Sequence, residues 1–221
     1  MSRFPPQVTR LQTPRGPVDI QSFCPPEMIG PLDFDPSLKR YTAYKPLLSD
    51  KETLLAAASK EEQNVTLACT QKGDIVGVAL LEYPSKEERW VRVGERIMME
   101  VAVLEVGAAW RSAGIAREML RALVDHPLKE NRIFYMVGYS WTWDLEGTGL
   151  TPIRYREMLI GLFSAFGFRT FQTNEPNILL RPENLFMARI GGQIPEGVQK
   201  RFKWVRFDMD RYLEDTGWKG A

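Results

Sequence analysis

The chain has 221 residues, 44% of them hydrophobic and 26% charged, a composition typical of a soluble globular protein with one domain or one domain with extensions. Its net charge of +1 gives no electrostatic reason to expect nucleic acid or an anionic membrane as a partner. The sequence has no membrane-spanning apolar run, no signal-peptide region and no metal-like spacing of its two cysteines. We therefore expect a cytoplasmic protein with no metal and no disulfide framework.

The first third of the chain combines loose segments with short elements. Residues 1–15 are polar and contain three prolines, so we expect a loosely ordered N-terminal extension. A turn-rich segment with further prolines occupies residues 26–40. The Ser49-x-x-Glu52 pattern of a capping box predicts the start of a helix, and the turn Gln71–Gly73 predicts a hairpin. The expected elements are Pro17–Phe23, Ser49–Lys60, Val65–Thr70 and Asp74–Tyr83.

Met98–Val106 is almost continuously apolar, which is typical of a central strand covered on both faces. Glu100 and Glu105 interrupt it. Carboxylates are rarely buried without a partner, so each must face a cleft, a cation or solvent. The sequence leaves open whether the two share a face, because a bulge between them would reverse the alternation of the strand.

The hexamer Arg111–Ala116 follows this strand and begins an amphipathic helix whose apolar positions recur at helical spacing. Helix N-termini carry unpaired N–H groups and partial positive charge, so an anion can bind there if no side chain blocks it. Ser112, Ala113, Gly114 and Ala116 are small, and Arg111 and Arg117 add charge. The alternative is an ordinary turn whose glycine only allows close packing.

The remaining elements complete a mixed α/β domain. A strand is expected at Arg132–Tyr139, and Thr151 followed by Pro152 predicts the start of a helix that Gly167 ends. Two closing strands and a C-terminal helix follow, at 168–173, 185–190 and 195–213. We expect the domain to span residues 16–192, with a C-terminal helical extension at 193–221.

Leu104-x-Val106 followed by Arg111-x-x-Gly114-x-Ala116 resembles motif A of the Gcn5-related N-acetyltransferase (GNAT) superfamily. The resemblance implies an α+β fold with a mostly antiparallel sheet, splayed at its centre and flanked by helices. It also implies acetyl-CoA as co-substrate. Main-chain groups of Leu104 and Val106 would bind pantetheine. The residues expected around the pyrophosphate are Arg111, Ser112, Ala113, Gly114, Ile115, Ala116 and Arg117.

A second resemblance covers residues from about 16 to 206 and is carried mainly by Trp141-x-Trp143-Asp144 and the glycine-rich turn up to Leu150. This run is similar to the acetoin utilization protein AcuA family of protein lysine acetyltransferases. The resemblance implies that the acceptor is a lysine of AMP-forming acetyl-CoA synthetase, which acetylation inactivates. Trp141, Trp143 and Asp144 are candidates for acceptor recognition, although the tryptophans could equally seal the core.

Direct transfer of an acetyl group to an amine requires a base but no enzyme nucleophile. Glu100 is the expected base, because the resemblance places the general base of histone-type members there, and Glu105 is the reserve. Tyr155 is a candidate proton donor or a packed aromatic residue. His126, the only histidine, is expected to be a solvated residue at a helix end.

Two other functions remain open on the sequence alone. The same chemistry could acetylate a small amine or a protein N-terminus. A protein of another class, a weakly catalytic acyl-CoA-binding regulator, would act by docking to a partner.

Overall fold

The computed structural model describes residues 4–38 and 50–210 of the chain. These residues form two compact units. Unit 1 comprises residues 1–82, 101–127 and 144–149, and unit 2 comprises residues 83–100, 128–143 and 150–221. In the described ranges, no helix is long and apolar enough to cross a membrane.

Unit 1 contains an antiparallel sheet whose strands follow the order β1-β2-β4-β5-β6. The short strand β3 adds to β5 in parallel, and a bulge interrupts the β4–β5 register between Ala68 and Cys69. Both cysteines are buried. The strands are β1 (Gln7–Thr13), β2 (Gly16–Ser22), β3 (Asp33–Phe34), β4 (Asn64–Thr70), β5 (Asp74–Glu82) and β6 (Met98–Val106), of which residues 101–106 belong to this unit.

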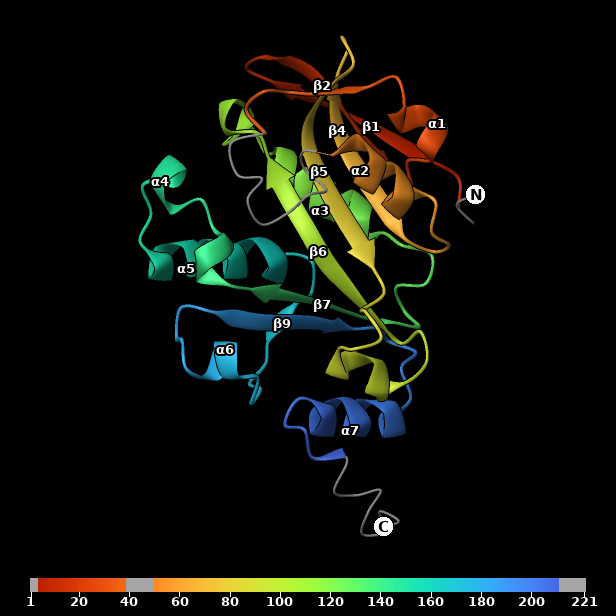
Figure 1. The fold of residues 1–221 in the computed structure, drawn as a ribbon, viewed down its shortest axis with the longest axis vertical. Coiled ribbons are helices and arrows are strands. Elements are labelled where there is room, and N and C mark those ends of the chain that lie inside the picture. Colours follow the sequence, from red (N-terminus) through yellow and green to blue (C-terminus); the bar gives the residue numbers. More distant parts are fainter. Residues whose placement is uncertain (1–3, 39–49, 211–221) are drawn as a thin grey trace. The chain divides into compact units, whose positions relative to one another are not determined.

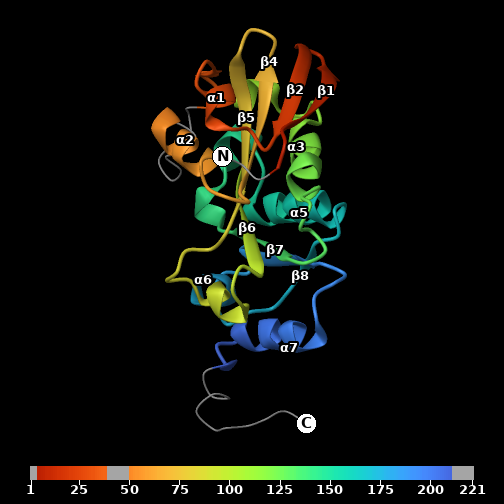
Figure 2. The same cartoon turned by 90° about the vertical axis from the view of Figure 1, so that its right-hand side faces the viewer.

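Helices cover both faces of this sheet, as Figure 2 shows. The helices α1 (Pro26–Ile29) and α2 (Lys51–Ala58) pack on one face, where Leu54 lies in a core cluster with residues of β4 and β5. The helix α3 (Ile115–Val124) packs on the other face against β2, β4 and β5. The sequence predicted an apolar stripe of Ile115, Met119, Ala122 and Leu123; Ala122 is only half-buried, and the buried residues are Ile115, Met119, Leu120, Leu123 and Val124.

Unit 1 corrects three sequence predictions. The expected loose segment 1–15 contains β1, which pairs along its whole length with β2 and is tied to it by an Arg10–Asp19 ion pair. The N-cap of α2 is Asp50, whose carboxylate accepts from the Glu52 N–H, whereas Ser49 lies outside the described residues. His126 is 1% exposed, with Nε2 bonded to the Glu62 carbonyl, because aromatic rings enclose it.

Unit 2 contains the first residues of β6 and three further strands in the order β6-β7-β9-β8. Figure 1 shows β7 beside β9. β6 pairs with β7 in parallel at Met98–Glu100, and the other pairs are antiparallel. The expected closing strands are present, but the first is short. The elements are β7 (Ile133–Gly138), α5 (Pro152–Ser164), β8 (Arg169–Thr170), α6 (Pro176–Leu179), β9 (Leu185–Ile190) and α7 (Glu196–Val205), with single 3-10 turns at Arg89–Val93 and Ser140–Thr142.

An aromatic cluster forms the core of unit 2. The Trp90 and Phe186 rings stack at 4.5 Å, and Tyr135 lies beside both. Phe202 and Val205 of α7 are buried in the same cluster, so the expected C-terminal extension contributes to this core. The helix ends at Val205, before a left-handed Asp208 with φ of 56°. Residues 211–213 of the predicted helix lie outside the described residues.

The architecture agrees with the fold class expected from the sequence. It is a mixed α/β arrangement with a mostly antiparallel sheet flanked by helices, and β3–β5 and β6–β7 are its parallel pairs.

Candidate active site

The loop after β6 is fixed tightly within unit 1. The Gly107 N–H donates to the Val76 carbonyl at 2.8 Å, and a side chain at Gly107 would overlap the Ser37 hydroxyl. The Trp110 indole N–H donates to Asp35 at 3.2 Å. Burial opposes ionisation of Asp35, but hydrogen bonds from Ser37 and Trp110 outweigh it and lower the pKa of this carboxyl. The chain therefore reaches the following turn in a defined direction.

The turn before α3 contains two left-handed residues, Ser112 with φ of 62° and Gly114 with φ of 80°. A left-handed residue other than glycine stores strain, and such strain often marks a functional site. Ser112 and Gly114 are exposed, and a Cβ added to Gly114 would meet no atom within 4 Å. The backbone of this turn is therefore open to a ligand.

The N-terminus of α3 is suited to bind an anion. Gly114 is the N-cap, and in the described part of the chain no side chain caps this helix. The N–H groups of its first turn consequently point toward solvent with the positive end of the helix dipole. Ile115 is buried beneath them and Arg117 is exposed. The start of α3 is therefore open at Gly114, where an added Cβ would meet no atom within 4 Å.

Arg111 begins the turn but directs its side chain into the protein. Its Nε donates to the Val106 carbonyl at 3.2 Å, Nη2 contacts Glu105 at 2.9 Å, and Nη1 contacts Asp144. Burial disfavours the charged guanidinium, but the hydrogen bond to Asp144 and the charge of Glu105 outweigh this and raise the pKa of Arg111. The structure thus brings together Glu105, Arg111 and Asp144, which the sequence assigned to three different roles.

Asp144 shapes the short helix α4 (Leu145–Thr148). Its Oδ1 accepts from the Gly147 N–H at 2.8 Å, and its side chain is 3% exposed. Any side chain at Gly147 would overlap this carboxylate, and Gly149 ends the helix in a left-handed conformation with φ of 66°. The Asp-x-x-Gly-x-Gly spacing is explained by this capping geometry.

Glu100 lies in unit 2, at the last residue of β6 that pairs with β7. It is half-buried and stands in register with Tyr135, whose hydroxyl donates to Glu88 at 3.2 Å. Glu105 belongs to unit 1 and has the ion pair with Arg111 described above. In unit 1, Leu104 is half-buried and Val106 is buried.

Two aromatic pairs follow β7 in unit 2. Trp143 stacks on Tyr155 of α5 with centroids 5.0 Å apart, as a packed aromatic pair. Trp141 is 40% exposed and stacks on Tyr139 at 4.7 Å, while the Arg181 guanidinium lies 5.3 Å from its centroid. Trp141 therefore presents an aromatic surface to solvent, whereas Trp143 and Tyr155 support each other.

Tyr139 is a residue that sequence reasoning missed. Burial, followed by the charges of Glu175, Glu100 and Glu88, raises the pKa of its phenol to about 12. The hydroxyl therefore stays protonated at neutral pH beside acidic groups of unit 2. The sequence signal that could have identified Tyr139 is its position just before the run that begins at Trp141.

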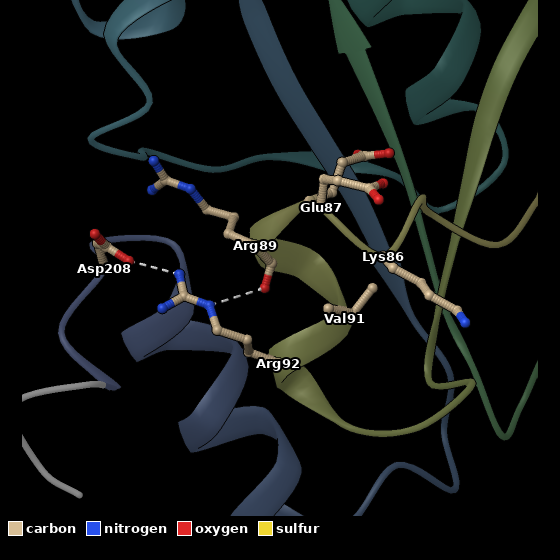
Figure 3. Close-up of a pocket in the computed structure, with 7 residues that line it drawn as sticks. Lys86, Glu87, Arg89, Val91, Arg92 and Asp208 are labelled. Atoms are coloured by element: carbon tan, nitrogen blue, oxygen red, sulfur yellow. Dashed lines mark hydrogen bonds and ion pairs between the residues drawn. The ribbon is translucent and has the colours of Figure 1, made fainter.

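A cavity of about 320 Å³ lies in unit 2 among residues that the sequence did not single out as a site (Figure 3). In it Arg92 donates to Asp208 at 2.5 Å and to the Arg89 carbonyl at 3.4 Å. Charges of both signs line it, so it favours no single ligand charge. Its lining residues are Lys86, Glu87, Glu88, Arg89, Val91, Arg92 and Asp208. Across both described ranges, no group of three His, Cys, Asp or Glu side chains is placed to hold a metal ion.

No family model matches the chain. The acetoin utilization protein AcuA of Bacillus licheniformis is 32% identical to it over 197 residues, which cover 89% of this chain and 92% of that protein. The chain belongs to the AcuA family. AcuA of Bacillus subtilis is 29% identical over 203 residues, or 92% of this chain and 94% of its own length.

A solved structure agrees with this assignment. The acetoin utilization protein of Exiguobacterium sibiricum matches with a TM-score of 0.84 at 29% identity, and the match covers 96% of this chain and 100% of that one. The family expected from the sequence is confirmed.

Proposed function

We propose that this AcuA-family protein is an acetyl-CoA-dependent protein lysine acetyltransferase, and that its substrate is the AMP-forming acetyl-CoA synthetase of the cytoplasm. The observation that carries the cofactor assignment is the start of α3, which is uncapped by any described side chain and preceded by the exposed, left-handed Ser112 and Gly114. The proposal includes neither nucleic acid nor a membrane as a binding partner.

The donor residues lie in unit 1. When bound, acetyl-CoA supplies the activated thioester. Backbone N–H groups of the turn and of the first helical residues bind the pyrophosphate, and Arg117 adds positive charge. Main-chain groups of Leu104 and Val106 align the pantetheine arm. Arg111 belongs to the pyrophosphate set through its main chain, together with Ser112, Ala113, Gly114, Ile115, Ala116 and Arg117.

Glu100 is the proposed general base. A lysine with a reference pKa near 10.4 must lose a proton before it attacks, which costs about 4.6 kcal/mol at pH 7. A carboxylate that accepts this proton, directly or through water, increases the rate by about 10²- to 10⁴-fold. Glu105 is the weaker choice, because its carboxylate is engaged by Arg111 at 2.9 Å.

Attack of the neutral amine on the thioester carbonyl forms the amide bond and breaks the carbon–sulfur bond, and the departing thiolate takes up a proton. Tyr155 is the proposed donor of that proton, and its stacking on Trp143 holds its ring in place. Backbone N–H groups of β6 would stabilise the charge that develops on the carbonyl oxygen.

Acceptor recognition is assigned to Trp141, Trp143 and Asp144. The exposed Trp141 offers a surface on which the stem of a lysine and its neighbours can pack. Trp143 supports this region through Tyr155, and Asp144 contributes by shaping α4. The relatives' designation as acetoin utilization proteins supports a role in the same area of metabolism.

The acceptor is tested by incubating the protein with acetyl-CoA and purified acetyl-CoA synthetase, followed by mass spectrometry of the synthetase. We expect one lysine to be acetylated, with loss of synthetase activity. Label that appears only on added small amines or on a protein N-terminus would contradict the proposed acceptor while leaving the acetyltransferase class intact.

The base is tested by Glu100→Gln, which keeps the size of the side chain and removes its ability to accept a proton. We expect the transfer rate to fall by about 10²- to 10⁴-fold with unchanged CoA affinity in calorimetry. The control Glu95→Gln changes an exposed glutamate of the same unit and should leave the rate unchanged. If Glu100→Gln still inactivates the synthetase at the normal rate, the protein is a docking regulator instead.

A further inference from the structure

We propose that the Arg111 side chain is a positioning clamp, which fixes the end of β6 to the start of α4, and that it is not a phosphate ligand. The inference rests on the CoA site proposed above for unit 1. It assigns to this residue a task that its place in the phosphate turn does not suggest.

The clamp is visible in the partners of the guanidinium. Three different nitrogens of Arg111 reach three different groups: the Val106 carbonyl, the Glu105 carboxylate and the Asp144 carboxylate. The planar fork of arginine is suited to hold several oxygens at fixed angles, which a lysine ammonium does not reproduce. Its side chain is only 22% exposed, so these contacts direct it into the protein.

Asp144 explains why the clamp persists when a ligand binds. Its side chain is 3% exposed, and its second oxygen caps α4 through the Gly147 N–H. Moving the Arg111 guanidinium to a phosphate would break its ion pair with this buried carboxylate, and breaking a buried ion pair is strongly unfavourable. Arg117 is exposed, so its charge is the more accessible of the two to the pyrophosphate.

The clamp has a consequence for the other end of the cofactor. The Val106 carbonyl that accepts from Arg111 belongs to the peptide assigned to the pantetheine arm. Loss of Arg111 should therefore disturb pantetheine binding as much as pyrophosphate binding. A phosphate ligand would affect only molecules that contain phosphate.

The test compares CoA with S-acetylpantetheine, which lacks the pyrophosphate and the nucleotide. Arg111→Lys keeps the positive charge but not the fork, and we expect it to weaken both ligands by about tenfold in binding measurements. The matched control is Arg121→Lys on the exposed face of α3, where Arg121 pairs with Glu118 at 3.4 Å. It should leave both affinities unchanged.

A variant that weakens CoA alone, or that binds both ligands normally, would overturn the clamp. Failure of the unaltered protein to bind CoA would instead contradict the proposed function. The clamp is then still tested without ligand, by urea unfolding of Arg111→Lys, Asp144→Asn and the double variant. Asparagine retains the N-cap. We therefore expect the free energy of unfolding of the double variant to be no lower than that of the less stable single variant. Fully additive losses would argue against the clamp.

Discussion

Ser112 and Gly114 show how single residues determine the shape of the proposed phosphate turn. Both have positive φ, but only glycine adopts this conformation without a steric penalty. Ser112 therefore carries strain that the fixed loop before it and the anchored helix after it must maintain. Gly114 has a second requirement, because the space beside its Cα is the space that a ligand would occupy.

Substituting Gly114 by valine should abolish detectable CoA binding. A β-branched side chain would fill the approach to the helix N-terminus and would also be strained at φ of 80°. Calorimetric titration with CoA measures the effect. The control Gly16→Val introduces comparable strain at another open glycine, with φ of 110°, in the β1–β2 turn. Unchanged CoA affinity in Gly114→Val would refute the pyrophosphate assignment.

At the scale of elements, α3 is anchored at its C-terminal end by a buried side chain from β4. The amide of Asn64 donates to the Leu123 carbonyl at 3.2 Å and accepts from the Phe23 N–H at 2.8 Å. Asn64 is 0% exposed, so these contacts are shielded from water. They link β4, the segment after β2 and the last turn of the helix whose first turn forms the donor site.

Replacing Asn64 by alanine should lower the free energy of unfolding by about 1–3 kcal/mol, because it leaves the buried Phe23 N–H and the helix carbonyl without their partner. Urea denaturation measures the loss. The control Ser59→Ala removes an exposed hydroxyl that donates to the Leu55 carbonyl of the preceding turn, and it should change stability little. Equal stability of Asn64→Ala and the unaltered protein would contradict this anchoring role.

Elements with local signals were predictable from the sequence. Thr151 caps α5 and Pro152 occupies its first turn as expected, because both effects depend only on neighbouring residues. β1 was missed because its residues are polar and mostly exposed, and only pairing with β2 makes them a strand. The same distinction holds at the site. Motif A located the turn, but the meeting of Arg111 with Asp144, 33 residues further on, depends on the fold.

At the scale of the whole molecule, the chain contains two units with separate apolar cores, and each unit draws on segments far apart in the sequence. The core of unit 2 needs the last described helix. Phe202 of α7 is 1% exposed and meets Phe171 with ring centroids 5.5 Å apart. The C-terminal helix is therefore part of the folded unit that carries Glu100.

Phe202→Ala should destabilise unit 2 by about 3–5 kcal/mol, through lost burial and the cavity that remains. Denaturation followed by far-ultraviolet circular dichroism measures this change. Lys200→Ala removes only an exposed ion pair with Glu196 on the same helix, and its effect should stay below about 1 kcal/mol. A similarly small effect of Phe202→Ala would show that α7 contributes little to the core.

The pairing of β1 with β2 also determines which strand forms the exposed edge of the unit 1 sheet. β1 is the outermost strand in the order β1-β2-β4-β5-β6, and it is mostly polar, with Arg10 held by Asp19. An exposed edge strand offers unpaired N–H and C=O groups, to which a strand of another chain can add. Polar or charged residues on the edge strand discourage this addition. Deleting residues 1–15 would make β2 the edge strand, and Val18 and Ile20 of β2 are buried. Shortened versions of the protein would then be prone to aggregation through strand addition.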